Sequence, residues 1–168
     1  MITIDNNLNK EDKEEIKRIF ESSGFFYNFE VDIALSIFDE TIEKGQEKSQ
    51  YYWLLLRSDK QLLGCAIFGP NPCTLYSWDF YWMVIDQNHR NAHLGKTLLA
   101  KVEQISKEKG CRILWIETAG REIYLPTRQF YLRNNYVEAA CMTDFYAPGD
   151  DKVIYRKDLA VCSAFFLQ

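Results

Sequence analysis

The sequence is poor in the residues that build metal sites, disulfide frameworks and membrane spans. It holds only two histidines and five cysteines, an odd number of thiols, in 168 residues, and no two cysteines have CxxC spacing. Because zinc sites need clustered His and Cys ligands, no metal site is expected. No apolar run reaches the ~18 residues that span a bilayer, and the polar, acidic amino terminus is unlike a signal peptide. We expect a protein of the cytoplasm that has no membrane partner.

The cysteines support this location. Most of them sit inside apolar runs, as Cys65 does in "LLGCAIF". Free thiols in apolar surroundings are typical of a reducing compartment, whereas secreted domains use paired cysteines. The pattern therefore predicts buried free thiols.

The chain also lacks an excess of positive charge. Its formal net charge is −4, so nothing in its overall charge favours binding to nucleic acid. Aromatic residues, by contrast, make up 15% of the chain, which indicates a core or cleft rich in rings. A small cationic or neutral partner fits this composition better than a nucleic acid.

No internal repeat, low-complexity tract or Pro/Gly-rich linker divides the sequence. A length of 168 residues suits one domain with a substantial core. We therefore expect a single domain over 1–168, in which residues 160–168 form an apolar extension. That extension is expected to add a strand, to pack on the surface or to meet a second subunit, so a homodimer is among the expected assemblies.

Hydrophobic periodicity and punctuation by glycine predict the elements. Helices are expected at 9–24, 30–45, 94–109 and 125–135, the first with Asn9 as its N-cap and the last beginning at Pro126. Strands are expected at 51–58, 62–69, 74–85, 111–118, 136–146 and 151–159. The run at 111–118 is continuously apolar, as in a parallel strand buried on both faces. The fold class that follows is mixed α/β: a mostly antiparallel sheet with a central parallel βαβ crossover and helices on both faces.

The segment "IDQNHRNAHLGK", from Ile85 to Lys96, joins the third long strand to a helix. Backbone N–H groups at a helix start, together with Gly95, Arg90 and Lys96, form a ready site for phosphate. The alternative is an ordinary polar loop, since every strand-to-helix junction has this geometry. The complete Walker and Rossmann glycine patterns are absent, which disfavours nucleotide hydrolysis and dinucleotide binding.

This segment resembles the acyl-CoA-binding signature of the GCN5-related N-acetyltransferases (GNAT), Arg/Gln-x-x-Gly-x-Gly/Ala. Arg90 and Gly95 hold the outer positions, and His93 stands where the first glycine is usual. Downstream, "FYLRNNY" is similar to the family's Phe-Tyr-x-x-x-Gly-Phe segment, with Asn135 in place of its glycine. His and Asn both tolerate the left-handed conformation better than most residues.

The resemblance implies direct transfer of an acetyl group from acetyl-CoA to a primary amine of a small molecule or peptide. A second possibility is a domain of the same fold that binds acyl-CoA as a sensor or interaction module without efficient catalysis, which His93 would favour. The cofactor-binding residues that the resemblance implies are Met83, Val84, Ile85, Arg90, Asn91, Ala92, His93, Leu94, Gly95, Lys96, Thr97 and Tyr124.

Tyr131 matches the family's frequent general acid, and a phenol is a plausible proton donor to a thiolate. Its alternative is a core aromatic ring. The general base is open between Asp79, in "SWDFYW", and Glu117, in "WIETAG". Either carboxylate could instead form a structural salt bridge. Asp144 is a third candidate, for substrate contact.

Two further residues near these segments stay unassigned. Arg128 lies on the short helix of Tyr131 and is expected either to contact the cofactor or to face solvent. His89 is not assigned as a base, because it is expected to face solvent and to have no carboxylate neighbour in the sequence. In the GNAT family, the first two helices, the loop after them and the final hairpin build the acceptor site. Here "SSGFFYNFEVD" and "DFYAPGDD" are aromatic and acidic, which suggests a cationic amine held by carboxylates and rings.

Overall fold

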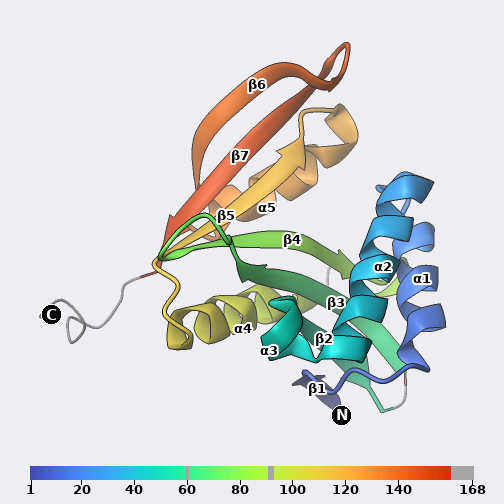
Figure 1. Cartoon of the computed structure of the whole chain (residues 1–168). Coiled ribbons are helices and arrows are strands. Elements are labelled where there is room, and N and C mark those ends of the chain that lie inside the picture. The colour runs from blue at the N-terminus through green and yellow to red at the C-terminus, as the bar shows by residue number, and fades with distance from the viewer. Residues whose placement is uncertain (60, 91–92, 160–168) are drawn as a thin grey trace, which may run out of the picture. The chain divides into compact units, whose positions relative to one another are not determined.

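The computed structural model describes residues 1–59, 61–90 and 93–159. Within these ranges the strands are β1 (Ile2–Asp5), β2 (Tyr52–Ser58), β3 (Gln61–Pro70), β4 (Ser77–Ile85), β5 (Ile113–Ala119), β6 (Val137–Ala147) and β7 (Asp150–Asp158). The helices are α1 (Asp12–Ser23), α2 (Asn28–Lys44), α3 (Gln46–Ser49), α4 (Leu94–Glu108) and α5 (Leu125–Arg133), with 3-10 turns η1 (Gln87–His89) and η2 (Glu122–Tyr124) (Figure 1). The strand order in the sheet is β1-β2-β3-β4-β5-β7-β6.

The chain divides into two compact units. Unit 1 contains Met1–Gly69 and Tyr81–Val102, and unit 2 contains Pro70–Phe80 and the chain from Glu103 onward. Strand β4 therefore gives its first four residues to unit 2 and the rest to unit 1.

Unit 1 is a sheet with apolar clusters on two faces. Strands β1, β2 and β3 pair antiparallel, with Ile4 opposite Leu56 and Leu55 opposite Cys65. Alternate residues of β2 and β3 pack with α1 and α2, which run side by side in Figure 1 (Ile16, Phe20, Val31, Phe38, Trp53, Leu55, Cys65 and Ile67). The opposite face packs with the start of α4 (Leu56, Leu63 and Leu94). The period-2 pattern of these strands thus places helices on both sides of the sheet.

A bulge in β3 lies next to the predicted cofactor-binding strand segment. The register shifts between Leu56 and Arg57, so that Leu63 is an extra residue of β3. Beside it, a Cβ added to Gly64 would lie 2.7 Å from the carbonyl oxygen of Val84. Glycine is required here because the backbones of β3 and β4 approach too closely for a side chain.

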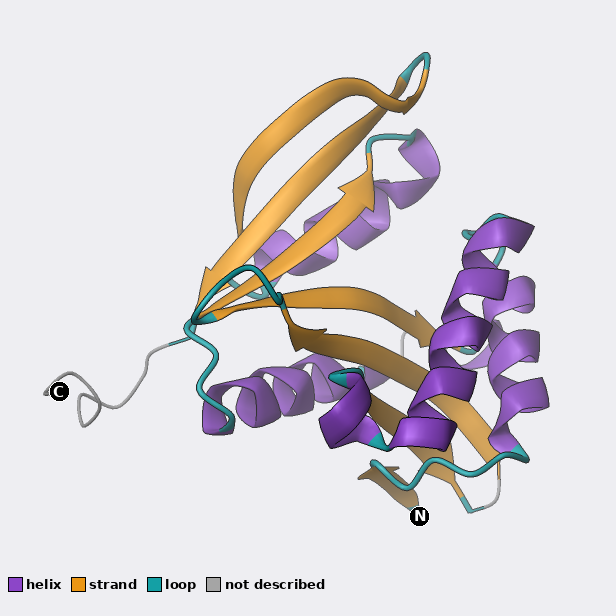
Figure 2. Ribbon diagram, in the orientation of Figure 1, coloured by secondary structure: helices purple, strands orange, loops and turns teal. Residues whose placement is uncertain are grey.

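Unit 2 is a sheet of β4, β5, β7 and β6 with α5 on one face (Figure 2). Strands β4 and β5 are parallel, with pairs from Ser77–Ile113 through Phe80–Ile116, and the remaining pairs are antiparallel. Leu114, Ile116 and Tyr155 are buried on the face where the rings of Tyr131 and Tyr136 lie. The other face carries Asp79, Trp115, Glu117, Lys152 and Arg156; we call it the polar face.

The predicted fold class is confirmed: a mixed α/β fold with a mostly antiparallel sheet and one parallel strand pair, β4–β5. Strand β1 was not predicted, because four residues at a polar amino terminus give a weak pattern. The prediction that Asn9 caps the first helix is wrong. The N-cap is Glu11, and the Asn9 backbone N–H donates instead to Asp12 Oδ2 at 2.9 Å.

No helix in the described ranges is long and apolar enough to cross a bilayer. Residues 160–168, for which the sequence predicts a strand, a surface segment or a subunit contact, lie outside the described residues.

Candidate functional site

The turn before α4 has a left-handed backbone at the position where the resembled signature has a glycine. His93 has φ 57°, in the left-handed region, and its side chain is exposed. Its carbonyl oxygen accepts hydrogen bonds from the backbone N–H of Thr97 at 3.1 Å and from the Thr97 hydroxyl at 3.2 Å. The first N–H groups of α4, from Leu94 onward, precede these bonds and have no acceptor within the helix. His93 therefore takes the conformation that glycine usually supplies.

Asn135 repeats this substitution in the second motif. It has φ 66°, two residues after the end of α5, and its backbone N–H donates to the carbonyl of Leu132 at 3.1 Å. Asn is one of the few residues that adopt this conformation at a helix end with little strain. Both residues that replace glycines of the resembled motifs thus have a left-handed backbone, which glycine adopts without strain.

The segment Asp86–Arg90 is anchored to α1 at both of its ends. The Asp86 carboxylate, 1% exposed, accepts hydrogen bonds from Arg18 Nη1 at 2.7 Å and from the Asn88 backbone N–H at 2.9 Å. At the other end, Arg90 Nη2 donates to the carbonyl of Ser23, the last residue of α1, at 2.8 Å. The Arg90 guanidinium also lies 4.9 Å from the centre of the Phe25 ring. The segment that leads to His93 is therefore held by two arginines.

These contacts change the pKa of the Asp86 carboxyl. Burial alone would raise the pKa of the Asp86 carboxyl, but hydrogen bonds from Arg18, the Asn88 backbone and His89 outweigh burial and lower it. The expectation that His89 has no carboxylate neighbour is wrong, because His89 Nδ1 lies 3.3 Å from Asp86 Oδ1. Asp86 was missed in the sequence because its partner Arg18 is 68 residues away.

The other predicted cofactor-binding residues fall in both units. In unit 1, Met83, Val84 and Ile85 form the last three residues of β4, and only Val84 is buried. Lys96 and Thr97 are exposed on the first turn of α4, with Gly95 half-buried beside them. Asn91 and Ala92 lie outside the described residues. In unit 2, Tyr124 ends η2, and the Arg121 guanidinium lies 5.3 Å from the centre of its ring.

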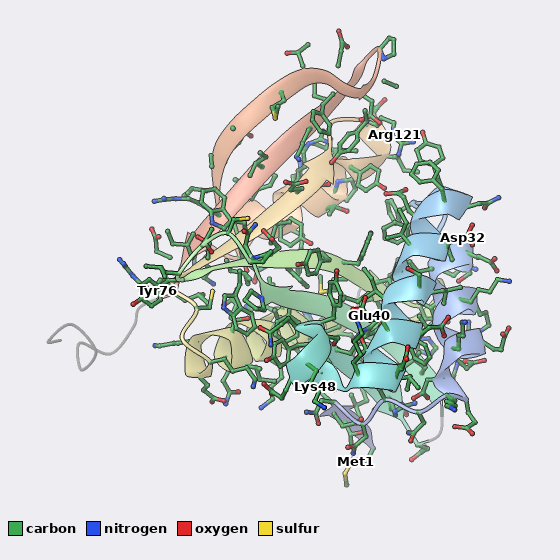
Figure 3. All side chains as sticks on the ribbon, in the orientation of Figure 1. Met1, Asp32, Glu40, Lys48, Tyr76 and Arg121 are labelled. Atoms are coloured by element: carbon green, nitrogen blue, oxygen red, sulfur yellow. The ribbon has the colours of Figure 1, made fainter. Side chains whose placement is uncertain are left out.

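Arg128 connects elements of unit 2 rather than facing solvent. Its Nη1 donates to the carbonyls of Ala119 at 2.8 Å and Arg121 at 3.0 Å. Figure 3 shows Arg121 at the end of β5 that leads toward α5. Arg128 therefore fixes the β5–α5 connection, a role that the sequence did not indicate.

The candidate carboxylates share the polar face of unit 2. Asp79 lies opposite Trp115 in the parallel pair, and Glu117 is two residues further along β5. Burial raises the pKa of the Asp79 carboxyl, while a 2.9 Å hydrogen bond from Asn71 Nδ2 opposes that rise. Glu117 forms an ion pair with Lys152, 2.6 Å from Nζ to Oε2. Lys152 is a contact that the sequence did not indicate.

Tyr131 lies on the opposite, apolar face. It is 6% exposed and is surrounded by the rings of Phe130, Tyr136 and Tyr155 at centroid distances of 5.4, 5.6 and 6.2 Å. Burial raises the pKa of its phenol, so the hydroxyl stays protonated across the neutral range. The geometry fits a core ring and also a protonated donor, so its catalytic role stays a prediction.

Asp144, the candidate for substrate contact, has a structural role in the β6–β7 turn. Its Oδ1 accepts a hydrogen bond from the Gly149 N–H at 2.7 Å, and its own N–H donates to Asp151 Oδ1 at 2.9 Å. Among the described residues, no group of three or more His, Cys, Asp or Glu side chains gathers as a metal site would.

Known proteins place the chain in a family. A model of the acetyltransferase (GNAT) family matches residues 14–136. The chain is 34% identical to a structure from Desulfovibrio desulfuricans assigned to the GNAT family of acetyltransferases, with a TM-score of 0.92 over 95% of this chain and 100% of that one. None of the curated proteins matches the chain.

More distant structures share the fold. One from Salmonella typhimurium, solved with its cofactor acetyl-CoA, has 16% identity and a TM-score of 0.74 over 97% of this chain and 96% of that one. An aminoglycoside 6'-N-acetyltransferase complexed with coenzyme A has 12% identity and a TM-score of 0.77 over 96% and 98% of the two chains. From the family match and the relative at 34% identity, the chain belongs to the GNAT family of acetyltransferases.

Proposed function

We propose that the protein is an N-acetyltransferase that moves an acetyl group from acetyl-CoA directly to a primary amine of a small molecule or peptide. The observation that carries this proposal is the turn before α4, where His93, at the position of a signature glycine, has a left-handed backbone. Family membership and relatives solved with acetyl-CoA or coenzyme A support it. The proposed location is the cytoplasm, and the homodimer expected from the sequence stays a prediction.

The residues of unit 1 fit the diphosphate of coenzyme A. The N–H groups of Leu94, Gly95 and Lys96, which have no acceptor within the helix, lie at the positive end of the α4 dipole. The exposed Lys96 ammonium adds a cationic contact, and Arg90 contributes by holding the segment against Ser23. Backbone groups of Met83–Ile85 are proposed to pair with the pantetheine arm, with Asn91, Ala92 and Thr97 completing the loop. Tyr124, from unit 2, is proposed as a further cofactor contact.

When bound, acetyl-CoA supplies a thioester carbon as the electrophile. The acceptor nitrogen forms the new C–N bond as the C–S bond breaks, so this chain must remove a proton from the amine and supply one to the thiolate. Asp79 or Glu117 takes the amine proton in this proposal; a carboxyl whose pKa is raised, as that of Asp79 is, makes the better base. Tyr131, which lies on the face opposite these carboxylates, is proposed to supply the proton to the thiolate, because its phenol is protonated at neutral pH.

A second function is an acyl-CoA-binding sensor or interaction module of the same fold without efficient catalysis. The imidazole of His93 favours it, because a side chain stands where the family's turn usually has only hydrogen.

Two measurements separate these functions. Calorimetric titration with acetyl-CoA tests cofactor binding, and release of free thiol in the presence of a panel of primary amines tests transfer. Binding with thiol release supports the enzyme. Binding without release on any amine supports the module, and the absence of binding overturns both.

Tyr131→Phe tests the proton donor. Removal of the hydroxyl should lower turnover about 100-fold, a typical loss for one general acid, while the affinity for acetyl-CoA stays within a few-fold. Steady-state rates and calorimetry measure the two quantities. The control is Tyr155→Phe, which removes another buried hydroxyl from the same ring cluster and should leave turnover nearly unchanged. Equal losses in both variants would assign Tyr131 to packing alone.

A further inference from the structure

The ion pair between Lys152 and Glu117 has an asymmetric exposure. The Lys152 side chain is 14% exposed, whereas that of Glu117 is 55% exposed. Ala119 lies opposite Lys152 and Ile154 lies opposite Glu117, so the two charged residues are diagonal neighbours on the polar face. The Lys152 side chain is thus largely covered, and the Glu117 side chain that pairs with it is open to solvent.

An aromatic ring completes the surroundings of this ammonium. Lys152 Nζ lies 4.5 Å from the centre of the Phe145 ring. Phe145 belongs to an irregular part of β6, where the register shifts between Met142 and Ala147. The Asp151 carboxylate holds this irregular part by accepting the Asp144 N–H. A carboxylate on one side and a ring on the other form the arrangement that recognises a primary ammonium.

Carboxylates outnumber cations here once Asp158, the ion-pair partner of Arg156, is counted with the polar face. Asp79 interacts electrostatically with both Glu117 and Lys152 and receives its hydrogen bond from the neutral amide of Asn71. The remaining cation of the face, Arg156, lies 6.0 Å from the Trp115 ring and pairs with Asp158 at 3.2 Å. Lys152 is therefore the cation that interacts with two carboxylates, Asp79 and Glu117. These three residues together carry one net negative charge, which a further cation would balance.

We propose that Glu117 and Phe145 form a recognition site for an ammonium group of the acceptor, and that Lys152 occupies this site until the acceptor displaces it. The proposal rests on the N-acetyltransferase function and specifies its substrate class: an aliphatic diamine, with one ammonium held by Glu117 while Asp79 takes the proton from the other. The four-carbon stem of lysine permits the displacement, because it has many rotamers that point into solvent.

The test is calorimetric titration of the full-length protein with 1,5-diaminopentane in the absence of acetyl-CoA. Lys152→Met removes the competing ammonium and keeps most of the side-chain length, so the dissociation constant should fall about tenfold. Glu117→Gln and Phe145→Leu remove the two sides of the site, and each should raise the dissociation constant about tenfold or more. An unchanged or higher dissociation constant in Lys152→Met would overturn the proposal.

Two matched variants serve as controls for the Lys152→Met titration. Lys152→Arg keeps a cation in the site and should bind the diamine as the wild type does. Lys44→Met removes another lysine–glutamate pair, from Lys44 to Glu40 at 2.8 Å on α2, and should leave the dissociation constant unchanged. If Lys152→Met does not fold, Lys152→Gln carries the same expectation. Because the titration needs no acetyl-CoA, a failure here is distinguishable from a failure of cofactor binding or thiol release.

Discussion

At the scale of single residues, His93 shows that a backbone conformation can be kept while the residue type changes. Its φ of 57° is the conformation for which glycine is the default, and its carbonyl still accepts the first bonds of α4 from Thr97. The sequence alone showed only that a glycine was missing. Histidine in general adopts the left-handed region more often than most residues do. Only the structure shows that the backbone at position 93 has this conformation.

His93→Gly should therefore preserve the affinity for acetyl-CoA within a few-fold, because the main-chain N–H groups and not the exposed imidazole are expected to contact phosphate. His93→Val should weaken binding about tenfold or more, since a β-branched residue strains this conformation. Calorimetry with acetyl-CoA measures both variants. A large loss of affinity in His93→Gly would show instead that the imidazole contacts the cofactor.

At the scale of elements, the connection between β4 and α4 is stabilised by α1. Two arginines, Arg18 within α1 and Arg90 after η1, join the helix to the connection through Asp86 and Ser23. Local patterns predicted the four longer helices and most strands, because amphipathic periodicity reports burial directly; the four-residue helix α3 was not predicted. Contacts such as Arg18–Asp86 and Lys152–Glu117 could not be predicted, since they depend on which elements become neighbours. The bulge at Leu63 could not be predicted from the sequence either, because one extra apolar residue leaves the apolar run of β3 continuous.

Asp86→Asn should destabilise the protein by about 2 kcal/mol at pH 7, because it removes a buried charge partner of Arg18. The pKa of Asp86 is lowered in the folded state, so its contribution is complete above the unfolded value of about 4. That contribution is lost as the pH falls through the lower folded-state pKa. Urea unfolding of wild type and variant at pH 7 and below pH 4 should show the difference shrinking in acid.

The control is Asp59→Asn, which alters a carboxylate that is 84% exposed and paired with the amino terminus. It should change the free energy of unfolding by less than about 0.5 kcal/mol at either pH. A difference between wild type and Asp86→Asn that does not depend on pH would assign the loss to packing instead of charge.

At the scale of the whole molecule, the thiols within the described ranges divide into two classes. The sequence predicted buried free cysteines, and Cys65 and Cys111 are buried, but Cys73 and Cys141 are exposed. Burial raises the pKa of the Cys65 thiol, and it raises that of Cys111 to about 12. Apolar neighbours in the sequence therefore predicted the burial of Cys65, within strand β3, correctly. They did not predict the exposure of Cys73, in a turn, or of Cys141, on the edge strand β6.

Native protein treated with iodoacetamide at pH 8 should be alkylated at Cys73 and Cys141 far faster than at Cys65 and Cys111, because the thiolate is the reactive form and access is required. Peptide mass spectrometry after timed quenching measures the extent at each site. In urea all four should react at similar rates. Rapid labelling of Cys65 in the native protein would contradict the burial of β3.

The division of β4 has a consequence for how the chain can be taken apart. The backbone passes from one unit to the other after Gly69, after Phe80 and after Val102, so each unit is assembled from separate stretches of sequence. Neither unit can then be obtained as an uninterrupted fragment of the gene, and a single proteolytic cut releases neither one intact. Every single cut of the backbone therefore divides at least one of the two units.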